Sequence, residues 1–312
     1  MRFLIFFAVS LALPAQIRVG IIGTDTSHVP AFTKMLNDSS APNFIPGARV
    51  VAAYKGGSKD IQQSISRVDN YASEIASKYG VEIVPDIATL LAKVDAVMLT
   101  SVDGRPHLEQ ARPVIAAHKP LFIDKPLAAS YSDAKEIARL AREAGVPWFS
   151  ASSLRWSEIT ETMKFDDARS VIAWGPGPLE EHHQQLDLGW YAIHPIEILF
   201  TLLGPGCEEV SRIETADGDL ITGKWKGGRT GAVQTLKPYG SYGAVVFRAG
   251  GKVIQSPPKP KTGYEELVSQ IVKFFQTRQP PVDNEVTLEI FAFMDAAQRS
   301  KQSAGALVKL RH

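Results

Sequence analysis

Short apolar segments and longer amphipathic ones alternate along the first half of this chain, and this alternation limits the fold more than any other feature. Segments of strand length occupy residues 17–22, 50–54, 81–84, 96–100, 120–123 and 147–150. Segments with helical periodicity separate them, at residues 30–37, 67–79, 87–93, 107–117 and 132–144. Because neighbouring parallel strands need a long crossover between them, usually a helix, the alternation predicts an α/β fold. We expect a mostly parallel, doubly wound sheet over residues 16–150.

The second half of the chain has a different pattern, in which strand-like runs are separated by glycine turns. These runs lie at residues 220–225, 231–236, 242–249 and 252–255, and two amphipathic helical stretches follow at 264–277 and 286–300. The pattern predicts a C-terminal α+β domain over residues 151–312 with a largely antiparallel sheet. An antiparallel sheet with one exposed face is also compatible with a homo-oligomer.

Charge and cysteine content exclude several classes of protein. The 312 residues hold 34 basic and 33 acidic side chains, a formal net charge of +1, so there is no overall basic field to hold nucleic acid or an anionic membrane. Cys207 is the one cysteine of the sequence, which excludes an internal disulfide and a site built from several thiolates.

The first fifteen residues have the pattern of a signal peptide: a basic start, an apolar run and a small residue at the end. We expect cleavage after Ala15 and export to the periplasm or the medium, although Leu13 is larger than signal peptidases prefer at that position. The apolar run is too short to span a bilayer, so no stable membrane span is expected after processing. A buried N-terminal strand is the alternative interpretation.

The turn after the first predicted strand is the first candidate for chemistry. Gly23, Thr24, Asp25, Thr26, Ser27 and His28 follow a strand and open a helix, which is where a Rossmann-like domain receives a dinucleotide pyrophosphate. Asp25 and His28 stand at the second and third glycine positions of the G-x-G-x-x-G pattern, so the motif is degenerate. A carboxylate at Asp25 would repel a pyrophosphate unless it is turned away or paired. A simple helix cap by Asp25 or Ser27 is the other interpretation.

The end of the next strand carries Lys55, where an acid usually holds the ribose of NAD. A cation at this place suits the 2′-phosphate of NADP, so the cofactor is expected to be NAD or NADP with a lean towards NADP. A solvated lysine on a mobile loop explains Lys55 equally well.

The segment Asp124-Lys125-Pro126 ends the fifth main strand, and it brings a family resemblance into view. The chain resembles the Gfo/Idh/MocA family of glucose-fructose oxidoreductases and inositol dehydrogenases, in which a strand-end E-K-P segment lies beside the nicotinamide. Further segments carry the resemblance: residues 101–107 with Ser101 and His107, residues 153–156, residues 189–199 and residues 296–300.

The resemblance implies an NAD(P)-binding domain over residues 16–150 and a reaction at a sugar or polyol carbinol. His194 and Glu197 match the family's histidine and later acid, whereas Trp190 stands where its first acid would be. Removal of a hydroxyl proton during hydride transfer needs a base, and Lys125 and His194 are the expected proton-handling pair. An ion pair of Lys125 with an acid, and a helix cap by His194, are the alternatives.

Aromatic faces and a guanidinium suit a polyhydroxylated ring, so the expected substrate wall consists of Arg155, Trp156, Trp190 and Tyr191. The resemblance adds His194 and Glu197 to the expected substrate residues. Core packing explains the two tryptophans equally well. Residues 180–183, Glu-Glu-His-His, invite a metal site, but adjacent histidines in a strand point to opposite faces. We expect no metal.

Export would place the enzyme where free NAD(P) is scarce, so we expect a retained cofactor and a redox-neutral cycle. An NAD-dependent glycosidase that oxidises its substrate transiently is the first alternative. The second is a carbohydrate-binding protein that kept the fold and lost the cofactor, motivated by Asp25, His28 and Trp190.

Overall fold

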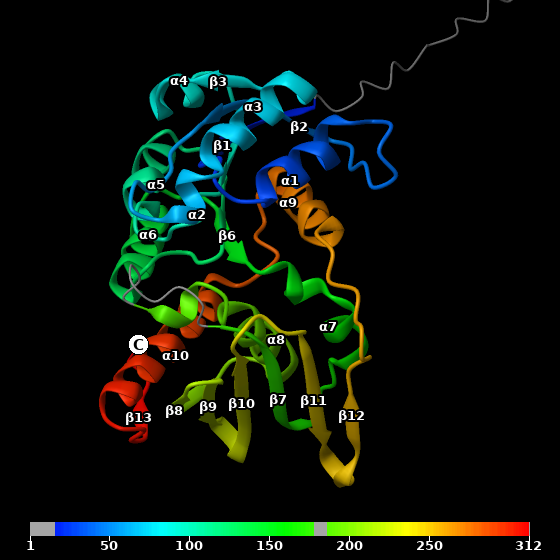
Figure 1. Ribbon diagram of the computed structural model, residues 1–312, viewed down its shortest axis with the longest axis vertical. Coiled ribbons are helices and arrows are strands. Elements are labelled where there is room, and N and C mark those ends of the chain that lie inside the picture. The colour runs from blue at the N-terminus through cyan, green and yellow to red at the C-terminus, as the bar shows by residue number, and fades with distance from the viewer. Residues whose placement is uncertain (1–15, 178–185, 312) are drawn as a thin grey trace, which may run out of the picture.

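The computed structural model describes residues 16–177 and 186–311, arranged as two sheets with helices around them (Figure 1). The expected signal peptide at residues 1–15 and the histidines of the metal interpretation, His182 and His183, lie outside the described residues.

The first sheet has six parallel strands in the order β3-β2-β1-β4-β5-β6. Their bounds are β1 (Ile17–Ile22), β2 (Ala48–Tyr54), β3 (Glu82–Val84), β4 (Ala96–Leu99), β5 (Leu121–Asp124) and β6 (Trp148–Ala151). The order reverses between β1 and β4, which is the point where doubly wound folds bind ligands at the carboxyl ends of the strands. The predicted parallel sheet is confirmed, with strand ends within about two residues of those expected.

Helices cover both faces of this sheet. The helices between its strands are α1 (His28–Asn37), α2 (Gln62–Ile65), α3 (Val68–Tyr79), α4 (Ile87–Leu91), α5 (His107–Ala116) and α6 (Tyr131–Glu143). Apolar residues of α1 and α3 pack on one face, and those of α4, α5 and α6 pack on the other. Helix α9 (Glu265–Thr277) also packs beside α1 on the first sheet, although it comes from the C-terminal half of the chain.

The second sheet has seven strands in the order β12-β11-β7-β10-β9-β8-β13. Their bounds are β7 (Ala168–Pro176), β8 (Cys207–Thr215), β9 (Gly218–Trp225), β10 (Arg229–Leu236), β11 (Gly243–Arg248), β12 (Val253–Gln255) and β13 (Val308–Lys309). The predicted largely antiparallel character is confirmed, with one parallel pair between β7 and β10. Strands β7 and β8 have no counterpart among the strands expected from the sequence.

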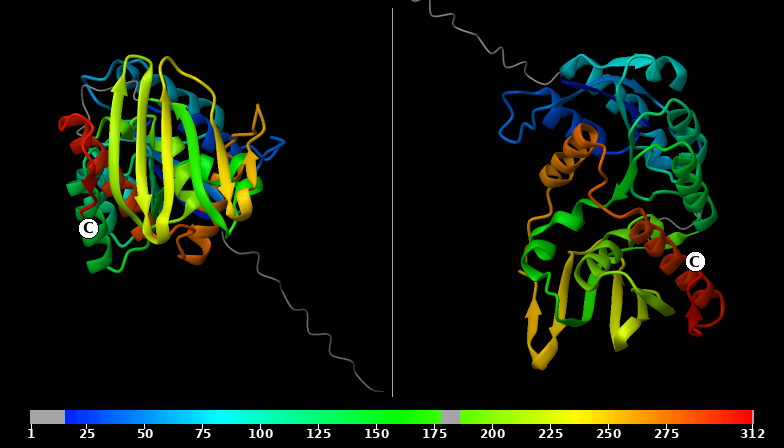
Figure 2. Two further views of the ribbon diagram at one scale, coloured as in Figure 1. Left: turned by 90° about the horizontal axis from the view of Figure 1, so that it is seen from below. Right: turned by 180° about the vertical axis from the view of Figure 1, so that it is seen from behind.

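One face of the second sheet is covered and the other is open. Helices α8 (Ile193–Leu203) and α10 (Asn284–Gln302) pack against its inner face, while η1 (Ser153–Trp156) and α7 (Glu158–Met163) follow β6 at the junction of the two halves. Figure 2 shows the outer face of the sheet without a covering helix. Exposed Ile172, Ile213 and Leu220 lie on strands of this sheet. The expectation of a homo-oligomer stays a prediction.

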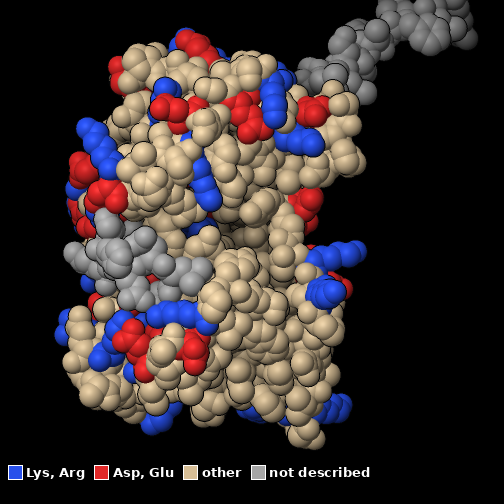
Figure 3. All heavy atoms as spheres, in the orientation of Figure 1, with Lys and Arg blue, Asp and Glu red and all other residues tan. Residues whose placement is uncertain are grey.

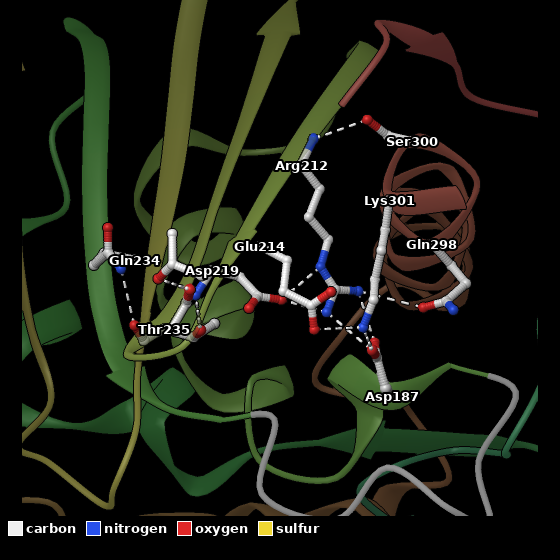
Figure 4. A network of polar contacts seen from close by, with 11 residues as sticks. Asp187, Arg212, Glu214, Asp219, Gln234, Thr235, Gln298, Ser300 and Lys301 are labelled. Atoms are coloured by element: carbon white, nitrogen blue, oxygen red, sulfur yellow. Dashed lines mark hydrogen bonds and ion pairs between the residues drawn. The ribbon is translucent and has the colours of Figure 1, made fainter. Parts of the chain in front are cut away.

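A buried ion-pair network anchors the short helix η2 (Asp187–Gly189) between the second sheet and α10 (Figure 4). The guanidinium of Arg212 on β8 contacts both carboxylate oxygens of Asp187 at 2.7 and 2.9 Å and donates to Asp219 at 2.6 Å. Lys301 of α10 reaches Asp187 at 3.1 Å. Because η2 leads directly into Trp190 and Tyr191, this network fixes the approach of that segment to the first sheet.

Charges on the molecular surface agree with the near-zero net charge. On the face shown in Figure 3, acidic and basic side chains lie intermixed and form no field of one sign. Among the described residues, no helix combines the length and apolar character that a membrane crossing requires.

Candidate active site

A cavity of about 310 Å³ lies at the carboxyl ends of the first sheet, where loops that follow β1, β4, β5 and β6 face residues of the C-terminal domain. Its lining is mostly polar and aromatic. The lining residues are Thr26, Ser27, His28, Gln63, Arg67, Val102, Lys125, Ser153, Leu154, Trp190, Tyr191, His194, Tyr239, Tyr242, Thr262 and Tyr264. The structure therefore brings both expected proton-handling residues, Lys125 and His194, to one cavity with the start of α1.

The glycine turn begins at Gly23, which has a φ of +90°. A Cβ atom at this position would lie 2.4 Å from the backbone nitrogen of Ser101, so glycine is required both by conformation and by space. Thr24 is fully buried, and its hydroxyl donates to the carbonyl of Val68 at 2.8 Å. Ser101 lies beneath the turn, where its hydroxyl donates to Gln110.

Asp25, at the second glycine position, is buried and paired. Its carboxylate accepts a hydrogen bond from the Ser64 hydroxyl at 2.6 Å and another from the Val102 amide at 3.0 Å. Burial raises the pKa of Asp25, which these hydrogen bonds partly offset. The condition set by the sequence, that this carboxylate be turned away or paired, is met.

His28 and Asp124 form a buried pair at the edge of the cavity. The Nδ1 atom of His28 lies 2.5 Å from Oδ2 of Asp124, and the His28 ring contacts Phe32 and Tyr264. Burial alone would raise the pKa of Asp124, but the neighbouring His28 and Lys125 outweigh it, and the pKa is lowered. The acid of the D-K-P segment therefore connects α1 to the end of β5.

Lys125 follows Asp124 and lines the cavity, with its amine 5.7 Å from the centre of the Tyr191 ring. Its pKa is lowered, because burial disfavours the ammonium form more than the carboxylate of Asp124 favours it. A lysine with a lowered pKa is better suited than an exposed one to accept a proton from a hydroxyl.

His194 is held in place by Ser152. The Ser152 hydroxyl oxygen lies 2.6 Å from His194 Nδ1 and accepts a hydrogen bond from the Leu154 amide. Burial, with Lys125 and His28 adding to the effect, lowers the pKa of His194 well below 6.5. His194 is thus a neutral ring, and a neutral imidazole has one donor and one acceptor nitrogen.

Four tyrosines line the cavity, and only Tyr191 was expected from the sequence. Tyr191 and Tyr239 contact edge to face at 5.8 Å, and Tyr242 lies 5.8 Å from the His194 ring. Tyr239 and Tyr242 lie between β10 and β11, and Tyr264 immediately precedes α9. No sequence motif marks these three tyrosines. They reach the carboxyl ends of the first sheet only through the tertiary fold, so the sequence alone did not reveal them.

Several expected site residues do not line the cavity. Arg155 and Glu197 form a buried ion pair with each other, and Arg155 lines a separate surface cavity. Burial raises the pKa of Glu197, with Arg155 acting in the opposite direction. Trp156 packs against the apolar cluster that includes α1 and α9.

The remaining expected cofactor residues lie around the cavity. Lys55 pairs with Asp69 of α3 at 2.8 Å, and both side chains are exposed. The buried His107 contacts the carbonyls of Ser101 and Leu127, which ties the loop after β4 to the loop after β5. Pro126 lies against η2, since a Cβ on Gly189 would be 3.5 Å from it.

The residues at the start of α1 fit the pyrophosphate of a dinucleotide. The Asp25 carboxylate is occupied by partners, and within the described chain the amides of Thr26 and Ser27 donate to no other backbone carbonyl. Free amides at a helix N-terminus are suited to a phosphate group. Lys125 and His194 line the same cavity, where a nicotinamide and a substrate would meet.

Comparison with known proteins agrees with this geometry. Residues 17–152 match the Gfo/Idh/MocA family model, described as an oxidoreductase family with an NAD-binding Rossmann fold. A search of curated proteins finds no match.

Solved structures share the fold over nearly the whole chain. A myo-inositol dehydrogenase from Lactobacillus casei, in complex with NAD(H) and myo-inositol, is 19% identical with a TM-score of 0.73, covering 95% of this chain and 97% of its own. An oxidoreductase from Agrobacterium radiobacter, in complex with NAD+, L-tartaric acid and magnesium, is 15% identical with a TM-score of 0.72, covering 95% and 98%. An NAD binding oxidoreductase from Klebsiella pneumoniae is 17% identical with a TM-score of 0.70, covering 96% and 100%.

The fold and the matched domain define an NAD-dependent oxidoreductase. The match of residues 17–152 to the Gfo/Idh/MocA family model confirms the resemblance seen in the sequence.

Proposed function

We propose that this protein oxidises a carbinol of a sugar or polyol with a retained NAD(P), in a redox-neutral cycle outside the cytoplasm. The observation that carries the proposal is the single cavity that joins the start of α1, Lys125, His194 and a group of tyrosines. The myo-inositol bound to the Lactobacillus casei structure supports a polyhydroxylated substrate.

Lys125 is the proposed base. The pKa of the buried amine is lowered, so its neutral form is more accessible than that of an exposed lysine, and this form accepts the proton of the substrate hydroxyl. Asp124 lies next to it in the chain and stabilises the resulting ammonium. When bound, the nicotinamide supplies the hydride acceptor.

His194 is the proposed donor to the reacting oxygen. The low pKa keeps the ring neutral, and we assign its proton to Nε2, with Nδ1 accepting a hydrogen bond from the Ser152 hydroxyl. A neutral donor holds the substrate oxygen in place without competing with Lys125 for the proton.

The tyrosines are the proposed sugar-binding wall. Tyr239 contacts both Tyr191 and Tyr242 in edge-to-face geometry, and the three rings offer apolar faces together with hydroxyl groups. This combination suits a sugar, which has apolar C–H faces and polar edges.

The expected signal peptide at residues 1–15 supports retention of the cofactor, since an exported enzyme has little free NAD(P) to exchange with. Within the cycle, the hydride taken from one carbinol is returned to the same or a second sugar, so no outside oxidant is needed.

Mass spectrometry of the purified chain from Gln16 tests the proposal. The protein is denatured, and any released nucleotide is identified and quantified. Stoichiometric NAD or NADP supports a retained cofactor, and NADP in particular supports the expectation from Lys55. A protein that is empty and also fails to bind added NAD and NADP contradicts the proposed function.

A further inference from the structure

Residues 58–67 contact the loop after β4 through polar side chains. Ser58 donates to Asp103 at 2.5 Å, and Asp60 binds the guanidinium of Arg105 through two hydrogen bonds of 2.9 and 2.7 Å. The same guanidinium also pairs with Asp103, so Arg105 links the segment to the buried base of the loop. We call residues 58–67 the clasp.

Two further contacts hold the middle of the clasp. Ser64 donates to Asp25 in the glycine turn at 2.6 Å. Ile61, Val102 and Trp190 form a separate buried apolar cluster, with Tyr191 packed against it. Because Trp190 belongs to the C-terminal domain, this cluster joins the clasp to the opposite wall of the cavity.

The clasp also contributes to the cavity that contains the start of α1. Gln63 and Arg67 line it together with Thr26, Ser27 and Val102. Within residues 16–177 and 186–311, no salt bridge and no side-chain hydrogen bond involves the guanidinium of Arg67. A cation therefore lies in the same cavity as the helix N-terminus that suits a pyrophosphate.

We propose that residues 58–67 close over the bound dinucleotide. Contacts with Arg105 and Trp190 hold the segment closed, and Arg67 is the cation that binds the phosphates. This inference rests on the proposed function, because it assumes that NAD(P) occupies the cavity. It adds a reason for slow cofactor release that the proposed function lacks.

The clasp accounts for two of the departures from the usual pattern that we noted in the sequence, Asp25 and Trp190. Asp25 replaces a glycine and receives the Ser64 hydroxyl of the clasp. Trp190 replaces an acid and packs on Ile61 of the clasp. Asp25 and Trp190 each depart from the usual family pattern, and each makes a contact with the clasp.

Cofactor exchange kinetics separate a clasp from an ordinary binding contact. NADH is bound to the full mature protein and chased with excess NAD+, and the loss of nicotinamide fluorescence gives the release rate. Association is followed by mixing NADH with protein from which the nucleotide has been removed. The variants are Arg105→Ala, Trp190→Ala, Trp190→Phe and Arg67→Gln, and Arg18→Ala is the control because its ion pair with Asp95 lies at the opposite end of the sheet.

A closed segment slows entry as well as exit. Arg105→Ala and Trp190→Ala are therefore expected to raise both the release and the association rates, the release rate by about tenfold. Trp190→Phe retains an aromatic contact with Ile61 and is expected to restore most of the slow release. Arg67→Gln is expected to raise the release rate by about tenfold and to leave the association rate the same or lower, since it removes a charge from the pathway.

The two proposals fail differently in this experiment. If the wild type binds NADH and the Arg105 and Trp190 variants release it at the wild-type rate, the clasp is wrong and the proposed function stands. If the wild type binds neither NADH nor NADPH, both are wrong. Circular dichroism of each variant, with a melting temperature close to that of Arg18→Ala, shows that a faster release does not come from unfolding.

Discussion

Single residues decide how a degenerate glycine motif remains compatible with a dinucleotide. The sequence places Asp25 and His28 where glycines are usual, and the structure shows both side chains engaged with partners, Ser64 and Asp124. The sequence could locate the turn, because Gly23 follows a strand and precedes a helix. It could not supply the partners, because they come from segments 39 and 96 residues away in the chain.

The pH dependence of stability tests the neutral state of His194. An unfolded histidine takes up a proton near pH 6.5, whereas the pKa of His194 in the folded protein lies well below this value. Between the two pKa values the unfolded state binds more protons, so stability falls as the pH drops below about 6.5, by up to about 1.4 kcal/mol per pH unit. Urea unfolding of the wild type and His194→Gln at several pH values from about 5 to about 8 measures this contribution. An identical pH dependence in both proteins would show that His194 is not buried as a neutral ring.

The Asp124–His28 pair is expected to stabilise the fold at neutral pH. Because the pKa of Asp124 is lowered on folding, its contribution is present above its unfolded pKa of about 3.9 and is lost as the pH falls through the folded value. Asp124→Asn leaves His28 buried without its carboxylate, and we expect a loss of about 3 kcal/mol in the free energy of unfolding at neutral pH. Asp69→Asn breaks an exposed ion pair and serves as the control. Equal stability of the two variants would contradict the role given to the buried pair.

At the scale of the elements, the Rossmann-type domain could be predicted almost completely and the second sheet only in part. Buried parallel strands read as continuous apolar runs, and β4, β5 and β6 are buried at every position. Strand β8 was not predicted, because its alternation of apolar and polar residues is interrupted. A register shift lies near Cys207, and Arg212 occupies an inward position. In the sequence, an arginine indicates a solvent-facing position. Arg212 is buried here because Asp187 and Asp219 neutralise its charge.

The Arg212 network should hold the second sheet, η2 and α10 together. Arg212→Met leaves the buried carboxylates of Asp187 and Asp219 without their main partner, so we expect destabilisation by about 3 kcal/mol or more in urea unfolding. Lys301→Met removes a half-buried partner and should cost clearly less. A larger loss for Lys301→Met than for Arg212→Met would reverse the order that the geometry predicts.

For the whole molecule, the site depends on a meeting of distant segments. Lys125 and His194 were expected from the family resemblance. The cavity that they share is also lined by tyrosines that no sequence motif marks. Arg155 and Glu197 were expected at the substrate and instead pair with each other. Sequence position identified the segments, but which side of a helix or loop faces the cavity depends on packing between the two halves.

The proposed export concerns the whole chain and can be measured directly. When the full sequence is expressed in a bacterium, we expect the protein in the periplasm or the medium, with Gln16 as its first residue after cleavage of the signal peptide. N-terminal mass spectrometry of the fractionated cells gives the result. Intact protein that starts at Met1 and stays in the cytoplasm would contradict export and would remove the main reason to expect a retained cofactor.

The most direct test of the account is a single-turnover absorbance measurement on the cofactor-loaded protein. Candidate sugars and polyols, including myo-inositol, are mixed with the wild type and with Lys125→Met, and the absorbance of the reduced nicotinamide is followed. We expect a transient rise and fall with a substrate in the wild type, and a rise slowed by about 100-fold or more in the variant, which still binds the cofactor. A rise at the same rate in both proteins would contradict the assignment of Lys125 as the base. If no candidate reduces the nicotinamide of the loaded wild type, the carbinol-oxidising cavity is contradicted.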